Sequence, residues 1–197
     1  TLLTLLFVVA TQLLFGQTVK NNFSLIDKRV LTIQSNSVDS LSHMLCSPYK
    51  TQIEKIRSIF KWVTENIEYD VVGYHNTKGV YSGLFRPSIS TIDSLVQKDY
   101  NDRIVEKVLK EKRAICDGYA RLFKTLCDKA NIQCVVISGY IRWYSDPIGV
   151  ITDRTHAWNA VVIKNKWQLL DPTWAIGTAD AEVIKFSKKY SGLYFFT

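Results

Sequence analysis

Several signatures of common protein classes are missing from this chain. It has no internal repeat and no low-complexity tract, and its 47% hydrophobic and 22% charged residues are typical of a globular domain. Its cysteines and histidines show no C-x2-C or H-x3-H spacing, and no dense acidic loop has the spacing of calcium ligands. We therefore expect neither a metal site nor a cofactor.

The positive charge of the chain is not concentrated on one segment. The 25 basic and 18 acidic residues give a net charge of +7, but Lys and Arg are scattered along the sequence. Nucleic-acid binding requires a basic face with a recognisable motif, and the sequence contains no such motif. We expect no nucleic-acid partner, and 197 residues suit one domain with a full hydrophobic core.

Charge is absent altogether from residues 1–17, TLLTLLFVVATQLLFGQ, where Leu, Phe and Val dominate. This run is too short to span a bilayer comfortably, so we expect no stable membrane span. We interpret it as a partial signal peptide of an exported protein, periplasmic or extracellular; the alternative is a first core helix. Residues 18–48 mix Asn, Ser and Asp with isolated apolar residues, which predicts a lead-in segment before a domain over 49–197.

Two amphipathic helices are predicted before residue 116. Residues 47–70, with Ser47-Pro48 as the helix start, space their apolar residues three and four apart: Ile53, Ile56, Phe60, Val63 and Ile67. Residues 99–113 show a similar stripe: Ile104, Val105, Val108 and Leu109. The glycine-rich segment from Val72 to Asp99 predicts a long loop between the two helices.

The stretch RAICDGYARLF, residues 113–123, places Cys116 immediately before a third amphipathic helix. Its apolar residues follow the helical period: Tyr119, Ala120, Leu122, Phe123, Leu126, Cys127 and Ala130. At a helix N-terminus the unpaired N–H groups and the macrodipole favour an anion, so a thiol there tends toward the reactive thiolate. A buried structural cysteine is the alternative on this stretch alone.

Beyond Gln133 the period of the apolar residues changes from 3.6 toward two. Residues 134–144, 156–163 and 166–171 are rich in Val, Ile, Trp and Tyr and predict three strands. Because helices precede strands, the sequence predicts an α+β fold with an antiparallel sheet. Cys127 and Cys134 lie on either side of a helix end and could pair in an exported protein, but their spacing does not decide this.

A second set of polar residues is brought together by the predicted hairpin. If Lys164-Asn165 forms a two-residue turn, Asp171 lies opposite Trp158, and His156 shares a face with Trp158. His156 and Asp171 are then diagonal neighbours, with backbones roughly 7–8 Å apart. A carboxylate in this position can hold an imidazole in the tautomer and orientation that a general base needs.

Five segments of the chain together resemble the transglutaminase-like superfamily: FKWVTENIEYD, AICDGYARLF, GYIRW, THAWNAVVI and KWQLLDPTWAIG. They are most similar to the branch of kyphoscoliosis peptidase-type domains, which is found in many exported bacterial proteins. The resemblance covers roughly residues 50–197 and implies a papain-like fold, with the nucleophile helix packed on a C-terminal antiparallel sheet. It also implies that the domain continues past residue 197.

The resemblance assigns a catalytic triad to residues of three predicted elements. It implies that Cys116 attacks an amide carbonyl, that His156 passes the proton to the leaving amine, and that Asp171 orients His156. We expect cysteine-dependent acyl transfer on a protein or peptide substrate through a thioester. An amine acceptor would make the enzyme a transglutaminase, and water would make it a peptidase or deamidase.

Aromatic residues flank the predicted triad, and an alternative function remains open. Trp158, Trp174 and Trp143 are candidates for the walls of the substrate groove, although large aromatic residues are as common in cores. The backbone N–H of Cys116 is a candidate oxyanion donor. The alternative is a non-catalytic module that binds protein or cell-wall peptide in the same groove. The sequence does not indicate the oligomeric state.

Overall fold

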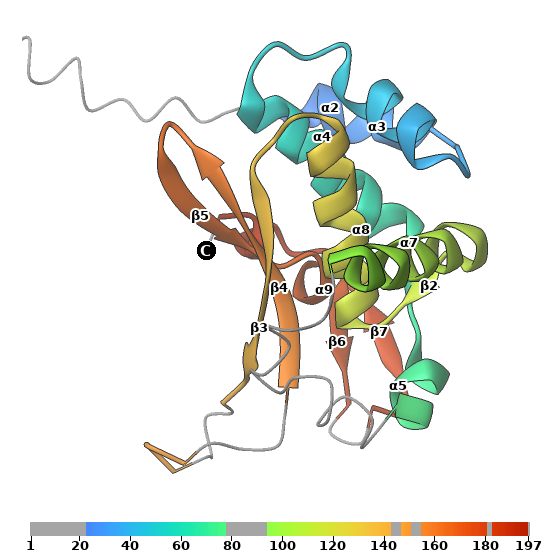
Figure 1. Ribbon diagram of the computed structural model, residues 1–197. Helices are drawn as coiled ribbons and strands as arrows, with labels where there is room; N and C mark the ends of the chain where they lie inside the picture. Colours follow the sequence, from blue (N-terminus) through green and yellow to red (C-terminus); the bar gives the residue numbers. More distant parts are fainter. Residues whose placement is uncertain (1–22, 78–93, 143–146, 151–154, 181–182, 197) are drawn as a thin grey trace, which may run out of the picture.

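The computed structural model describes residues 23–77, 94–142, 147–150, 155–180 and 183–196. The helices are α2 (Ser24–Val30), α3 (Val38–Cys46), α4 (Gln52–Asn66), α5 (Val71–Thr77), α7 (Ser94–Glu111), α8 (Cys116–Lys129), α9 (Pro172–Ala175) and the 3₁₀ turn η2 (Gly192–Tyr194). The strands are β1 (Glu68–Tyr69), β2 (Arg113–Ala114), β3 (Cys134–Tyr140), β4 (Thr155–Ile163), β5 (Lys166–Leu170), β6 (Gly177–Ala179) and β7 (Phe186–Lys188). Helix α8 contacts α3, α4 and α7 and also lies against β3 and β4 (Figure 1). The predicted α+β class, with the nucleophile helix packed on an antiparallel sheet, is confirmed.

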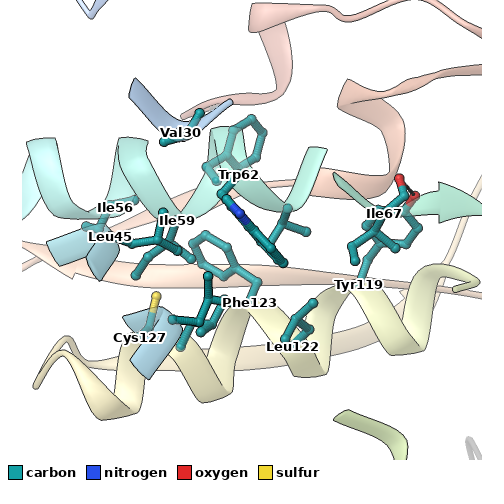
Figure 2. Close-up of a cluster of buried hydrophobic side chains, with 14 of the residues drawn as sticks. Val30, Leu45, Ile56, Ile59, Trp62, Ile67, Tyr119, Leu122, Phe123 and Cys127 are labelled. Atoms are coloured by element: carbon teal, nitrogen blue, oxygen red, sulfur yellow. Dashed lines mark hydrogen bonds between the residues drawn. The ribbon is translucent and has the colours of Figure 1, made fainter. Parts of the chain in front are cut away.

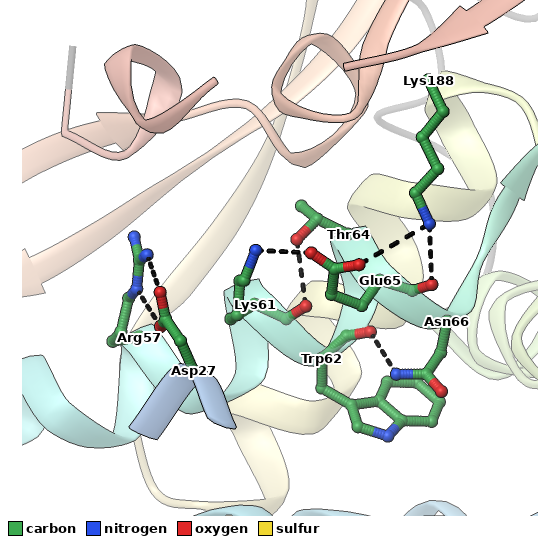
Figure 3. Close-up of polar contacts among 8 residues, drawn as sticks. All are labelled: Asp27, Arg57, Lys61, Trp62, Thr64, Glu65, Asn66 and Lys188. Atoms are coloured by element: carbon green, nitrogen blue, oxygen red, sulfur yellow. Dashed lines mark hydrogen bonds and ion pairs between the residues drawn. The ribbon is translucent and has the colours of Figure 1, made fainter. Parts of the chain in front are cut away.

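The segment expected to be a lead-in, residues 18–48, contains two helices that pack into the core. Helices α2 and α3 bury the apolar side chains of Ile26, Val30, Leu41 and Leu45. Asp27 of α2 also forms a 2.6 Å ion pair with Arg57 of α4 (Figure 3). The packed domain therefore begins upstream of residue 49. Residues 1–17 lie outside the described part of the chain.

Helix α4 begins at Gln52 rather than at the predicted Ser47-Pro48, which instead follows the end of α3. The Thr51 hydroxyl accepts the Glu54 N–H at 3.3 Å, and the Glu54 carboxylate accepts the Thr51 N–H at 3.1 Å. This reciprocal capping box satisfies two N–H groups of the first turn and so fixes the start of the helix. At the other end, Lys188 of β7 donates to the Glu65 carbonyl at 3.0 Å (Figure 3).

The apolar faces of α4 and α8 meet in the centre of the molecule (Figure 2). None of the labelled side chains there is more than 1% exposed: Val30, Leu45, Ile56, Ile59, Trp62, Ile67, Tyr119, Leu122, Phe123 and Cys127. The two polar atoms in this set are satisfied, because Trp62 donates to the Ile33 carbonyl and Tyr119 to the Ile67 carbonyl. Burying such side chains stabilises a fold by about 1.5–3 kcal/mol each, so this packing fixes the position of α8 in the fold.

The main sheet has the order β3-β4-β5 and is antiparallel throughout. Strands β4 and β5 pair from Asn159↔Leu170 to Ile163↔Lys166, which confirms the predicted register. Lys164 and Asn165 form the turn with φ of 49° and 61°, the left-handed values that a tight two-residue hairpin requires. The sheet thus brings the start of β4 beside the end of β5.

The predicted loop over 72–99 is partly helical. Val71–Thr77 form α5, helix α7 begins at Ser94, and residues 78–93 lie outside the described residues. Directly before α8, β2 pairs in parallel with β1. This pairing, the short helix α9 and the β6-β7 pair were not predicted from the sequence. Strand β2 comes just before α8, and α9 directly follows Asp171.

Candidate active site

Cys116 is the first residue of α8 and is half-buried. The residue before it, Ile115, is extended, and no described side chain caps the first turn. The N–H groups of that turn therefore remain available to an anion. The chain entering the helix is held by the Asp70 N–H, which donates to the Ala114 carbonyl at 2.8 Å.

Gly118 allows the neighbouring elements to approach the first turn of α8 closely. A Cβ at this position would lie 2.8 Å from the Ala114 Cβ and 3.0 Å from the Val108 Cγ2. Glycine in a helix interior costs roughly 1 kcal/mol relative to alanine, and here the close packing of β2 and α7 explains its use. Gly118 thus allows the first turn of α8, which begins at Cys116, to pack closely against β2 and α7.

His156 and Asp171 meet at the start of β4 and the end of β5. The His156 Nε2 and the Asp171 Oδ2 are 2.5 Å apart, and both side chains are buried. The other carboxylate oxygen of Asp171 accepts the Trp174 N–H at 2.9 Å, so Asp171 also caps α9. Because Nε2 faces Asp171, the remaining ring nitrogen, Nδ1, is the one available to a thiol.

Opposing effects act on the protonation of His156. Burial lowers the pKa of its imidazole, but hydrogen bonds to Asp171 and to the Cys116 side chain outweigh burial and raise the pKa to about 9. At neutral pH the imidazolium form is therefore favoured. The structure thus brings the three predicted residues together: His156 is hydrogen-bonded to Asp171, and Cys116 is near enough to the imidazole to raise its pKa.

Two of the three predicted tryptophans border this set. The Trp174 and Trp158 rings lie nearly parallel to the His156 ring, with centroids at 4.9 Å and 5.8 Å. Trp174 is 41% exposed and so presents an aromatic surface next to the site. Trp158 covers Gly139, where a Cβ would lie 2.6 Å from the indole. Trp143 lies outside the described residues.

Two residues beside Cys116 were not identified from the sequence. Asp117 is only 3% exposed and pairs with Arg121 at 2.8 Å. Tyr69 lies opposite Ala114 in the β1-β2 pair. Burial, and to a smaller extent the electrostatic effect of the neighbouring Cys116 side chain, raise the pKa of the Tyr69 phenol, which keeps it protonated. Tyr69 comes near Cys116 through the pairing of β1 with β2, which are far apart in the sequence.

The other cysteines are free thiols in the core. Cys46, Cys127 and Cys134 are all buried, and the pairing of Cys127 with Cys134 that the sequence left open is not formed. Burial raises the pKa of Cys46 to about 11. Within the described residues no cluster of three His, Cys, Asp or Glu side chains could hold a metal ion. In the same part of the chain no helix is long and apolar enough to cross a membrane.

Comparisons with known proteins define the family. The model of the transglutaminase-like superfamily matches residues 39–172. Kyphoscoliosis peptidase of Mus musculus is 30% identical over 169 residues, which cover 85% of this chain and 22% of the mouse protein. Kyphoscoliosis peptidase of Homo sapiens is 29% identical over 164 residues, which cover 82% of this chain and 22% of the human protein.

A solved structure described as a TGase aligns with a TM-score of 0.43 and 16% identity, covering 96% of this chain and 42% of that one. The family match extends over more than half of the sequence. The chain therefore belongs to the transglutaminase-like superfamily, as the sequence motifs predict. It spans only about a fifth of the length of the kyphoscoliosis peptidases that it matches.

Proposed function

We propose that this domain catalyses cysteine-dependent acyl transfer on protein or peptide amides. The single observation that supports this proposal best is the buried His156, which is hydrogen-bonded to Asp171 and has its pKa raised by the neighbouring Cys116 at a helix N-terminus. This combination supplies a nucleophile, a proton carrier and an orienting group. The other described cysteines are buried in the core and lack such partners.

The first half-reaction forms a thioester. The Cys116 sulfur attacks the amide carbonyl carbon, and the backbone N–H of Cys116 is a donor for the resulting oxyanion. The C–N bond then breaks as the His156 imidazolium gives its proton to the departing amine or ammonia. Asp171 keeps its negative charge throughout and holds the imidazole in place.

The second half-reaction decides the type of enzyme. His156, now neutral, accepts a proton from a primary amine or from water as that molecule attacks the thioester carbonyl. Breaking the C–S bond regenerates the thiolate and the imidazolium. An amine gives a transglutaminase product, and water gives the product of a peptidase or deamidase. The raised pKa of His156 supports this scheme, because the resting site then already holds the proton that the leaving group needs.

Variant kinetics with a glutamine-containing peptide test the proposal. Members of a triad act as one unit, so Cys116→Ala alone should lose nearly as much activity as Cys116→Ala combined with His156→Ala. Cys46→Ala removes a buried thiol outside the set and serves as the matched control. A double variant much less active than the Cys116→Ala single variant would show that His156 works elsewhere, contrary to the proposal.

A further inference from the structure

Asn159 connects three elements around the candidate site. It is fully buried in β4, three positions after His156. Its side-chain amide donates to the Ala120 carbonyl of α8 at 3.0 Å and to the Val135 carbonyl of β3 at 3.3 Å. Because both neighbours are acceptors, the NH₂ group must face them, and this fixes the orientation of the amide. The Asn159 side chain thus links α8 to β4 and β3.

The hydrogen bonds of Asn159 lie close to Cys116 and His156 without involving either residue. Ala120 is one helical turn beyond Cys116, or about 6 Å along the axis of α8. Asn159 is about 10 Å along β4 from His156. The bond from Asn159 to Ala120 therefore joins α8 to β4 one helical turn from Cys116 and three residues from His156. Its loss would allow the helix and the strand to shift relative to each other at that point.

The choice of asparagine here is not favoured by packing alone. The Asn159 Oδ1 is buried and has no hydrogen-bond partner among the residues that the structure describes. Leaving such an atom unpaired destabilises the folded state, whereas an apolar side chain of similar size would carry no such atom. The presence of asparagine at this position is therefore better explained by the hydrogen bonds that its NH₂ group donates to α8 and β3.

We infer that Asn159 is a positioning residue that sets the contact between the Cys116 thiol and the His156 imidazole. The inference rests on the proposed function, since it assigns Asn159 to the geometry of that same thiol and imidazole pair. Misplacement of reacting groups by about 1 Å can lower a rate by about 10²-fold. Asn159 itself contacts no reacting atom.

The pH dependence of Cys116 alkylation by iodoacetamide, followed by peptide mapping of the full chain, tests the inference. Asn159→Leu keeps the number and branching of the side-chain heavy atoms and removes the donors, and Asn159→Ala is a second variant in case the larger leucine does not fit. The matched control is Ser42→Ala, because Ser42 of α3 also donates to an α8 carbonyl, that of Leu126, at 3.0 Å, but toward the far end of the helix.

The two kinds of variant should behave in opposite ways. Asn159→Leu should move the alkylation profile of Cys116 to higher pH and slow the reaction at neutral pH by about tenfold or more. Its midpoint in urea should stay the same or rise, because the unpaired oxygen is gone. Ser42→Ala should lower the urea midpoint and leave the alkylation profile unchanged.

Other outcomes overturn the inference and can be told apart. A folded Asn159→Leu or Asn159→Ala variant with the wild-type profile would show that Asn159 does not position the pair. Loss of folding in both variants would show that its role is structural. The proposed function fails separately if His156→Ala leaves the alkylation profile of wild-type Cys116 unchanged, because no thiol and imidazole pair would then exist to be positioned.

Discussion

Replacing Asp171 with asparagine should separate the two roles of its carboxylate. One oxygen accepts the Trp174 N–H at 2.9 Å and caps α9, and the other lies 2.5 Å from the His156 Nε2. Asparagine caps helices about as well as aspartate, so Asp171→Asn keeps the cap, whereas Asp171→Ala loses about 1 kcal/mol. Both variants lose the negative charge that faces His156.

The magnitude of the effect follows from the protonation of His156. Burial lowers the pKa of this histidine, yet hydrogen bonds to Asp171 and Cys116 raise it from 6.5 to about 9. That rise corresponds to about 3 kcal/mol in favour of the imidazolium. Without the Asp171 charge, burial opposes a weaker attraction, so the pKa should fall back toward or below 6.5. Acyl transfer should fall by up to about 10⁴-fold, the loss that the same change causes in a Ser-His-Asp triad.

Nuclear magnetic resonance titration checks this reasoning directly, because the chain has only 3 histidines and His156→Gln identifies the signal of interest. The wild-type His156 signal should titrate near pH 9, and the two Asp171 variants should share a much lower midpoint. Their unfolding free energies should differ by about 1 kcal/mol, the value of the cap. A wild-type midpoint near 6.5, or one that Asp171→Asn leaves unchanged, would refute the argument.

Three further predictions follow from the same features. Because the folded-state pKa of His156 is raised, its contribution to the free energy of unfolding is complete below pH 6.5 and is lost as the pH rises through about 9. Urea titrations of the wild-type protein should therefore show that the free energy of unfolding falls by about 3 kcal/mol between about pH 6 and about pH 10, and His156→Gln should abolish this fall. The same dependence of the unfolding free energy on pH in both proteins would contradict this. Iodoacetamide should label Cys116 before the buried Cys46, Cys127 and Cys134, and peptide mapping that finds equal labelling would exclude Cys116 as the nucleophile. We also propose that the protein is exported, so N-terminal sequencing of the mature protein from cells should start after about residue 17. Retention of Leu2 to Phe15 in the mature protein would support a core helix instead.

The hairpin that carries His156 and Asp171 could be predicted because its determinants are local. Alternating apolar residues and the two-residue turn at Lys164 and Asn165 fix the register, and that register places the two side chains on one face. The position of Cys116 was equally accessible, since the apolar stripe that follows it marks the start of α8. The T-x-x-E sequence from Thr51 to Glu54 would also have located the start of α4.

Features that depend on distant partners could not be found in this way. Helices α2 and α3 have 7 and 9 residues and owe their stability to packing, so their sequences resemble a linker. Strands β1 and β2 have 2 residues each, too few for a pattern, and they place Tyr69 near Cys116 only by pairing. The contact of Asn159 with the Ala120 carbonyl depends on how α8 lies on the sheet. Sequence periodicity carries no information on that arrangement.

Trapping an acyl-enzyme tests whether Cys116 carries out acyl transfer. A glutamine-containing peptide is mixed with the protein, the reaction is quenched rapidly in acid, and the peptide that contains RAICDGYAR is examined by mass spectrometry. The account predicts an acyl adduct on Cys116 that is absent from Cys116→Ala and weaker in Asp171→Asn. Added primary amine should divert the product from acid to amide if the enzyme is a transglutaminase. A broad panel of glutamine and cell-wall peptides that yields no adduct, on a protein whose Cys116 alkylates readily, would contradict the enzymatic account and favour a binding module.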